Sequence, residues 1–305
     1  MDEMIQCIKR SKNLGSDQVV NKLSNFIIRL FLFLVALTCI LPFIHVLAKS
    51  LSNEAYVVAQ EVYLWPKGFN LEAYKKVIFD QSIIRSFFIS IFITVVFTLL
   101  GMVLTVCAAY PLSRKHLKGR NGITFFFMFT MYFAGGIIPD YLLMNKLNML
   151  DTIWSIILPL AFSPYNLLIM KTSFQASISD SLIESAVIDG ASQFRILRSI
   201  VLPLSKAILA TITLFYAVGR WNAYQDALFY IKQNVNIRPL QLKLYYLIST
   251  STEAVNATME GTAQYTNPEV LKTACIIFTT VPIICVYPFV QKYFVKGTMI
   301  GAVKG

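Results

Sequence analysis

The chain has 305 residues, of which 56% are hydrophobic and 14% are charged, and its formal net charge is +11. Soluble domains carry about 25% charged residues, so this composition excludes an ordinary soluble domain and favours a membrane protein. The Lys and Arg residues border apolar segments and form no basic tract, which argues against nucleic-acid binding despite the positive charge.

Six segments are long and apolar enough to cross a membrane, since a spanning helix needs about 20 mostly apolar residues. They lie at about 25–48, 84–112, 121–144, 152–172, 199–222 and 270–293. The first is expected to be a retained span, because it follows a polar stretch and lacks a signal-peptide cleavage pattern. The third contains Gly135-Gly136 and Pro139, and the fourth contains Pro159 and Pro164, which predicts kinks in both.

The distribution of basic residues predicts the orientation. The segment "SRKHLKGR", residues 113–120, carries four basic residues in eight. Basic loops face the cytoplasm, so both termini and the loop 173–198 are predicted to be cytoplasmic. The loops 49–83, 145–151 and 223–269 are predicted to face outward, and the last is expected to be exposed.

These boundaries divide the chain into four parts. They are a cytoplasmic N-terminal tail, 1–24; the first span with its outer loop, 25–83; a core of spans two to six, 84–293; and a cytoplasmic C-terminal tail, 294–305.

Several function classes find no support in the sequence. It contains no GxxxxGK[ST] phosphate loop and no hydrolase motif, so we expect no catalytic residues. The two His residues have no nearby Cys or His with which to share a metal, so we expect no metal site. Carboxylates are almost absent from the span centres, which disfavours an ion-coupled carrier. Asp140 and Asp226 are interpreted as border charges near the outer face.

An amphipathic helix at about 179–192 separates the fourth and fifth spans. Ser179 can cap its N-terminus, and Gly190 can end it in a left-handed conformation. Leu182, Ile183, Ala186 and Val187 are spaced to form one apolar face. Such a helix can lie on the lipid surface or dock in a groove on a soluble partner, and physical reasoning alone leaves both open.

The residues of this helix and the stretch after it resemble the EAA loop of permease subunits in binding-protein-dependent ABC importers. The matching positions are Glu184, Ser185, Ala186, Asp189, Gly190, Ala191, Phe194, Ile200, Leu202 and Pro203. The pattern is closest to the carbohydrate-uptake, maltose-type branch, and Ser185 departs from its usual Ala.

The resemblance extends over roughly residues 70–305. "LFYAVGRWNAYQDAL", "GGIIPDYLLMNKLNMLDTIWSIILP", "NLEAYKKVI" and "QKYFVKGTMIGAVKG" are similar to other parts of the same family. Within the carbohydrate branch, "FYAVGRWN" and "RPLQLKLYYLI" look most like permeases for fragments of complex, often acidic, polysaccharides.

The resemblance implies a type I importer fold in the bacterial cytoplasmic membrane. It implies four partners: a second, non-identical permease subunit, two ATPase subunits, which bind ATP and Mg²⁺, and an extracellular solute-binding protein. The chain itself would bind no cofactor. The EAA helix would couple the ATPases to the spans, with Glu184 meeting a basic residue and Gly190 allowing a turn where a side chain would clash. Lys304 and Gly305 are expected near the ATPases.

Polar and aromatic residues toward the outer half are candidates for the sugar path. They are Tyr132, Tyr165, Asn166, Trp221, Asn222 and Gln225. Arg220 and Arg238 are candidates for neutralising an acidic sugar, although Arg220 is more typical of a side chain that reaches a lipid headgroup.

Three alternatives remain at this stage. The cargo of such an importer could be a peptide, an amino acid or an osmolyte. The chain could be an ion-coupled carrier that works alone, or an interfacial scaffold without transport.

Overall fold

The computed structural model describes residues 2–133, 135–259 and 268–302, with the side chains of 24–133, 135–249 and 269–288. Every regular element in these ranges is helical, which confirms the all-α prediction. The elements in chain order are α1 (Asp2–Ser50), α2 (Glu54–Val58), α3 (Glu72–Phe79), α4 (Gln81–Ser113), α5 (Arg120–Tyr132), α6 (Ile137–Lys146), α7 (Trp154–Ile157), α8 (Pro164–Ser177), α9 (Asp180–Ile188), α10 (Gln193–Ile196), the π-helix η1 (Leu197–Val201), α11 (Leu202–Leu204), α12 (Lys206–Asn222), α13 (Gln225–Tyr230), the 3₁₀-helix η2 (Val235–Ile237), α14 (Leu240–Met259) and α15 (Pro268–Ala302).

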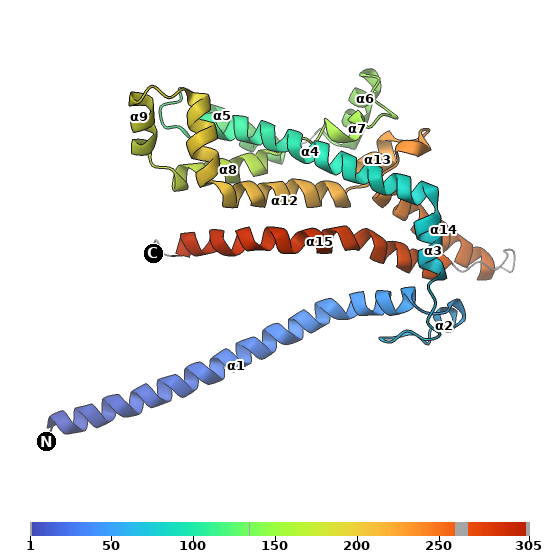
Figure 1. Cartoon of the computed structure of the whole chain (residues 1–305), viewed down its shortest axis with the longest axis horizontal. Coiled ribbons are helices and arrows are strands. Elements are labelled where there is room, and N and C mark those ends of the chain that lie inside the picture. Colours follow the sequence, from blue (N-terminus) through green and yellow to red (C-terminus); the bar gives the residue numbers. More distant parts are fainter. Residues whose placement is uncertain (1, 134, 260–267, 303–305) are drawn as a thin grey trace.

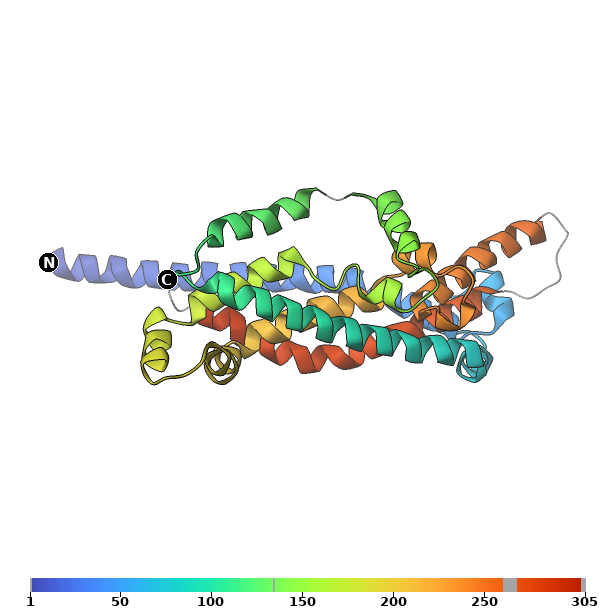
Figure 2. The ribbon, with the colours of Figure 1, turned by 90° about the horizontal axis from the view of Figure 1, so that it is seen from above.

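The molecule is elongated, and its two ends carry different elements. The helices α4, α8, α12 and α15 run lengthwise as a bundle, and α5 and α6 flank it on one side (Figure 2). The start of α1, the end of α15 and the short helix α9 lie at one end, whereas α2, α3, α6, α7, α13 and α14 lie at the other (Figure 1). We call these the α9 end and the α13 end. Their assignment to the cytoplasmic and outer sides remains a prediction.

Three helices in the described part of the chain are long and apolar enough to cross a membrane. They contain Ser24–Ser50, Gln81–Ser113 and Glu269–Pro288, and match the predicted first, second and sixth spans. Two bent pairs raise the number to as many as five: α5 with α6 at 107°, and the α10–α11 segment with α12 at 85°. The described residues therefore contain three to five candidate spans, and six are not established.

The predicted fourth span, 152–172, is not one helix. It consists of the four-residue helix α7, an irregular stretch, and α8, which begins at Pro164. Proline fits the first turn of a helix, and the Ser163 hydroxyl accepts from the Asn166 amide at 3.3 Å to cap it. Ile156, Ala161 and Leu167 in this region are buried, so the irregular backbone lies within the protein.

The predicted fifth span begins later than expected, at Lys206 instead of residue 199. Pro203 lies in the short helix α11, and the chain turns at Ser205 before α12 begins. Because proline lacks an N–H and crowds the preceding turn, it favours a break here. Pro203 therefore lies at a break before the span and not in the first turn of α12.

The expected tails and outer loop are more helical than predicted. α1 passes position 24 without a break, and α15 continues beyond position 293. Residues 303–305, with Lys304 and Gly305, lie outside the described residues. The segment 223–269, expected to be an exposed loop, contains the 20-residue helix α14.

The main core lies where α4, α8 and α12 meet. Phe97, Leu167, Met170 and Ile212 are buried in it. Gly101 lets the stretch between α7 and α8 pack closely against α4. A Cβ at this position would lie 2.7 Å from the Ala161 carbonyl oxygen.

The hydroxyl of Tyr216 links the same three segments. It lies 2.7 Å from the Thr105 Oγ1 and accepts from the Ser163 amide at 3.0 Å. The core therefore fixes α12, whose last residues lead into the α13 end, against α4 and α8.

Candidate functional site

The amphipathic helix predicted near 179–192 forms as α9, from Asp180 to Ile188. Ser179 has the extended backbone of a capping residue, but its side chain makes no capping hydrogen bond. Instead, the Ser181 hydroxyl donates to that of Ser179 at 3.2 Å. Ser179 is therefore at the predicted N-cap position, but its side chain does not make the hydrogen bond expected of a cap.

Gly190 ends the helix as predicted. Its φ is +78°, and the Ala191 amide donates to the Ala186 carbonyl at 2.9 Å. A Cβ on Gly190 would meet nothing within 4 Å, so the expected clash is absent within this chain. The left-handed φ alone accounts for the glycine here.

The apolar residues of α9 point in two directions. Ile183 and Ala186 are buried in the main core, whereas Leu182 and Val187 of the predicted single face are exposed. Ile188 and Phe194 are the most exposed apolar residues of this loop, at 85% and 71%. The remaining residues of the predicted coupling set divide by exposure: Glu184, Ser185, Asp189, Gly190 and Pro203 are exposed, and Ala191 and Leu202 are half-buried.

Two polar contacts fasten this loop to the end of α4. Asp180 pairs with Lys115 at 2.7 Å, and the Tyr110 hydroxyl donates to Gln193 Oε1 at 2.8 Å. The hydrogen bond and charge of Lys115 hold the pKa of Asp180 below its usual value, so the carboxylate stays ionised. The α9–α10 loop is thus positioned by the bundle while its exposed residues face away from it.

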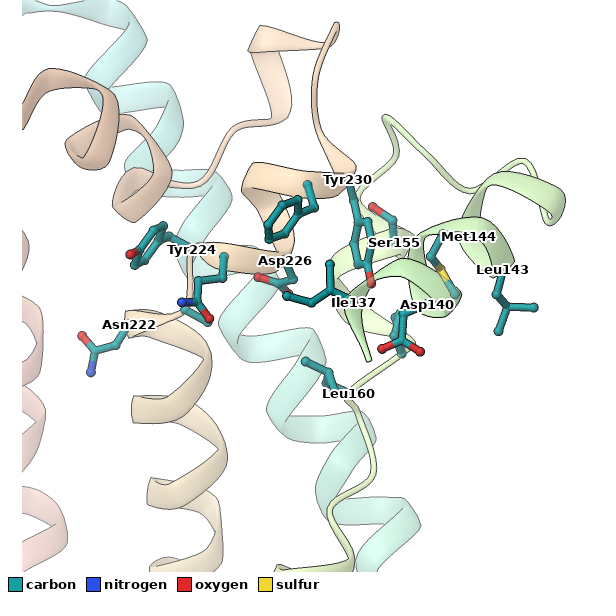
Figure 3. A pocket seen from close by; sticks show the side chains of 14 residues that line it. Ile137, Asp140, Leu143, Met144, Ser155, Leu160, Asn222, Tyr224, Asp226 and Tyr230 are labelled. Carbon is teal, nitrogen blue, oxygen red and sulfur yellow. The ribbon is translucent and has the colours of Figure 1, made fainter. Parts of the chain in front are cut away.

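A cavity of about 510 Å³ lies at the α13 end, between α6, the α7–α8 stretch and the end of α12. Its polar residues include Asp140, Asn222, Tyr224, Gln225, Asp226 and Tyr230 (Figure 3). We call it the outer pocket. A second cavity of about 670 Å³ adjoins it, because Leu160 and Ala223 line both. Both volumes fall in the range of about 300–1,000 Å³ typical of small-molecule sites.

Four of the six predicted path residues line these cavities. Asn222 and Gln225 line the outer pocket, and Tyr165 and Asn166 line the second cavity. The other two line neither: Trp221 is buried, with its Nε1 donating to the Thr279 carbonyl at 3.3 Å, and Tyr132 is 81% exposed at the end of α5.

The predicted sugar path omitted most lining residues of the outer pocket, among them Tyr224, Asp140 and Tyr230. Tyr224 lies within the quoted stretch "LFYAVGRWNAYQDAL", two positions after Asn222, so that motif could have pointed to it. Asp140 lies within the quoted stretch "GGIIPDYLLMNKLNMLDTIWSIILP" but was interpreted only as a border charge. Tyr230 lies outside the quoted stretches, and the fold brings its helix α13 against α6 from a distant part of the chain.

Arg220 and Asp226 form a buried ion pair between the end of α12 and α13. Arg220 Nη1 lies 2.5 Å from Asp226 Oδ2, and Nη2 donates to Oδ1 at 2.8 Å. Nη1 also donates to the Ile156 carbonyl at 2.9 Å. The guanidinium is occupied inside the protein, so the expectation that Arg220 reaches a lipid headgroup is wrong. Arg220 also lines the second cavity, and its role toward an acidic sugar stays a prediction.

The second arginine proposed for an acidic sugar, Arg238, also has partners in the structure. Its Nη2 donates to the Lys232 carbonyl at 2.8 Å, and its guanidinium lies 5.0 Å from the centre of the Tyr246 ring. It lines neither cavity.

Comparison with known proteins gives long matches. The chain is 44% identical over 278 residues to Protein LplC of Bacillus subtilis (strain 168), covering 90% of this chain and 93% of the relative. It is 41% identical over 286 residues to the polygalacturonan/rhamnogalacturonan transport system permease protein YtcP of the same organism, covering 93% and 99%. No family model matches.

A solved structure has the same fold. It is the crystal structure of a bacterial ABC transporter involved in the import of the acidic polysaccharide alginate. The TM-score is 0.79 at 33% sequence identity, and the match covers 90% of this chain and 97% of the other.

Proposed function

The chain belongs to the permease subunits of ABC transporters for sugars, and from this premise we propose that it forms part of the membrane pathway of an ATP-driven importer of oligosaccharides. The substrates are fragments of complex polysaccharides, including acidic ones. The observation that carries this proposal is the match along nearly the whole chain to a polygalacturonan/rhamnogalacturonan permease. The similarity to a structure of an alginate importer supports the same substrate class.

The partners follow from this assignment. In our proposal a second, non-identical permease subunit completes the pathway, two ATPase subunits bind ATP and Mg²⁺ beneath it, and an extracellular solute-binding protein delivers the sugar. The exposed apolar surface of α1 supports a helix that contacts lipid or another subunit, because residues 24–44 are exposed. The chain contributes no bond chemistry; its role is to bind sugar differently in two conformations.

We further propose that α9 is the coupling helix. Three features support this: the exposed Glu184, the exposed apolar residues Ile188 and Phe194, and the contact of the loop with α4 through the hydrogen bond from Tyr110 to Gln193. Exposed apolar side chains beside a charge suit a groove on a soluble partner. Helices that lie on the lipid surface typically carry Lys and Arg on their polar face, whereas α9 carries Asp180 and Glu184 and no basic residue, which disfavours that alternative.

The proposed topology has both termini at the cytoplasmic side, in the bacterial cytoplasmic membrane. It is supported by the position of α9, the start of α1 and the end of α15 at one end of the molecule (Figure 1). Six crossings require that each bent pair, together with the α7–α8 segment, spans the membrane. The outer pocket and the second cavity then lie toward the extracellular side, where sugar enters.

The test is ATP hydrolysis by the assembled complex. The two permeases and two ATPases are reconstituted in nanodiscs, and the solute-binding protein is added with and without oligogalacturonate. The proposal predicts that hydrolysis rises several-fold only when the binding protein and the sugar are both present. Stimulation by a peptide or an amino acid instead of any oligosaccharide would assign the transporter to another cargo.

A further inference from the structure

The outer pocket has a distinct charge pattern. Asp140 and Asp226 both line it, and among the described residues that line it there is no Lys, Arg or His. Its other polar groups are neutral amides and hydroxyls from Asn222, Gln225 and Tyr230. A pocket for a carboxylate would be expected to offer a cation, because arginine and lysine pair with that group most strongly.

Three cations of the surrounding segments, Arg220, Lys232 and Lys146, do not line the outer pocket. Both terminal nitrogens of Arg220 bind Asp226, so this pair contributes little net charge to the pocket. Lys232 lies over the ring of Tyr141, with Nζ 4.9 Å from its centre. Lys146 lies in the last turn of α6 and does not line the pocket.

Asp140 is the carboxylate that remains uncompensated. It lies in the first turn of α6, where the helix dipole favours a negative charge, and it has no ion-pair partner among the described side chains. Burial, and after it the charges of Asp140 and Asp226, raise the pKa of Tyr230. The Tyr230 hydroxyl therefore stays protonated and available as a donor.

These groups match the chemistry of an uncharged sugar. An ionised carboxylate only accepts hydrogen bonds, and sugar hydroxyls donate them. Figure 3 shows Asp140 from α6 near Tyr230 at the end of α13. The ring of Tyr224 lies on the far side of the group, stacked on Tyr245 with 5.1 Å between the ring centres. Tyrosine rings provide flat apolar surface with a polar tip, which suits the face of a sugar ring. A uronate carboxylate in the same space would meet the like charge of Asp140 with no cation to offset it.

We propose that Asp140 is a specificity-determining residue, which makes the outer pocket accept an uncharged sugar residue and reject a uronate. The inference rests on the proposed import of oligosaccharides and narrows it. An acidic oligosaccharide would then pass this pocket only with an uncharged residue facing Asp140, or with its carboxylates held elsewhere, for instance by the second permease subunit.

The test uses trigalacturonate and its fully methyl-esterified form, which differ in charge and in the added ester methyl groups; the comparison with Asp140→Asn isolates the effect of charge. Their equilibrium binding to the assembled permease and ATPase complex in nanodiscs is measured without the solute-binding protein, whose own selectivity is thereby removed. We expect the wild type to bind the ester at least about tenfold more tightly than the free acid. In Asp140→Asn the affinities for the ester and the free acid should differ by no more than about threefold, mainly because the acid binds more tightly.

Two control variants accompany this comparison. Asp140→Glu keeps the charge and should keep the preference. Glu61→Gln removes a carboxylate that pairs with Lys67 and does not line the pocket, and should leave the preference unchanged.

Several outcomes would overturn the inference: equal wild-type affinities, a gap that survives Asp140→Asn, an equal loss of preference in Glu61→Gln, or no binding of either probe. Sugar-stimulated ATP hydrolysis is measured on the same preparations. If sugar stimulates ATP hydrolysis but the complex binds both probes with equal affinity, the proposed function is supported and the specificity role of Asp140 is rejected. If hydrolysis responds to no oligosaccharide, the proposed function itself fails.

Discussion

The guanidinium of Arg220 and the carboxylate of Asp226 form a two-point ion pair inside the protein, with side chains only 2% and 13% exposed. The pair joins the last turn of α12 to α13, and the bond from Arg220 to the Ile156 carbonyl adds α7. Three segments that surround the outer pocket are therefore held by one side chain.

Removing one partner of this pair should be costly. Asp226→Ala leaves a buried guanidinium without its counter-charge, and such changes cost about 3–5 kcal/mol. We expect a large drop in the thermal unfolding temperature of the purified protein. Lys67→Ala, which breaks the exposed pair with Glu61, is the control and should cost less than about 1 kcal/mol. Equal losses in the two variants would contradict the assigned burial.

Gly101→Ala tests the close approach of α4 to its neighbours. The new methyl group would lie 2.7 Å from the Ala161 carbonyl oxygen and 2.9 Å from the Tyr216 ring, so backbone must move. Overpacking of this kind costs about 1–3 kcal/mol. Gly122→Ala in α5 is the matched control, because its Cβ would meet nothing within 4 Å. Thermal unfolding should show destabilisation only for Gly101→Ala; a neutral result there would place these helices further apart.

Asp151 should make stability depend on pH at the α13 end. Its carboxylate accepts backbone N–H groups of Lys232, Gln233 and Asn234 at 2.8, 2.8 and 3.2 Å. Desolvation is the largest single influence and raises its pKa, but the three hydrogen bonds and the charge of Arg238 together outweigh it, so the pKa lies below the ordinary value of 3.8. A lowered folded-state pKa contributes stability above the unfolded value that is lost as the pH falls through the folded one.

We therefore expect Asp151→Ala to destabilise the protein at pH 7, with the difference from wild type shrinking as the pH falls below about 3.8. Thermal unfolding at a series of pH values measures this difference. A gap that stays constant down to the lowest pH would mean that the ionised carboxylate is not what holds the 232–234 segment.

The exposed residues of α9 and α10 should bind the ATPase without stabilising this chain. Glu184→Lys, or Ile188→Ala with Phe194→Ala, should lower co-purification of the ATPase several-fold and leave the unfolding temperature of the isolated permease unchanged. Ser199→Ala, at an exposed position of the same loop, should change neither quantity. If the ATPase co-purified normally with all these variants, α9 would be assigned to the lipid surface instead of the ATPase interface.

Long elements were predictable from the sequence because their apolar runs need no partner to be recognised. This holds for α4 and α15, and for α9, whose end is marked by Gly190. The breaks between α7 and α8 and at Ser205 were predicted less well. Their backbone is held by distant groups, such as the Tyr216 hydroxyl that accepts from Ser163, and no local pattern reveals such a partner.

The residues of the candidate site were likewise predictable only in part. The polar and aromatic character of "WNAYQDAL" led to Asn222 and Gln225, and both line the outer pocket. Asp140 belongs to the same pocket but reaches it through the folding of α6 against α13. Trp221 has the expected chemistry and points instead into the protein, toward the Thr279 carbonyl, because helix rotation decides which side chain faces the cavity.

The most direct test of the central claim is uptake of radiolabelled rhamnogalacturonan oligosaccharides, which carry both uncharged and uronate residues, into proteoliposomes. These contain both permeases and the ATPases, with ATP enclosed and the solute-binding protein on the opposite side. We predict accumulation that requires both hydrolysable ATP and the binding protein and does not respond to an imposed ion gradient. Uptake that is driven by an ion gradient and proceeds without ATP would contradict the account.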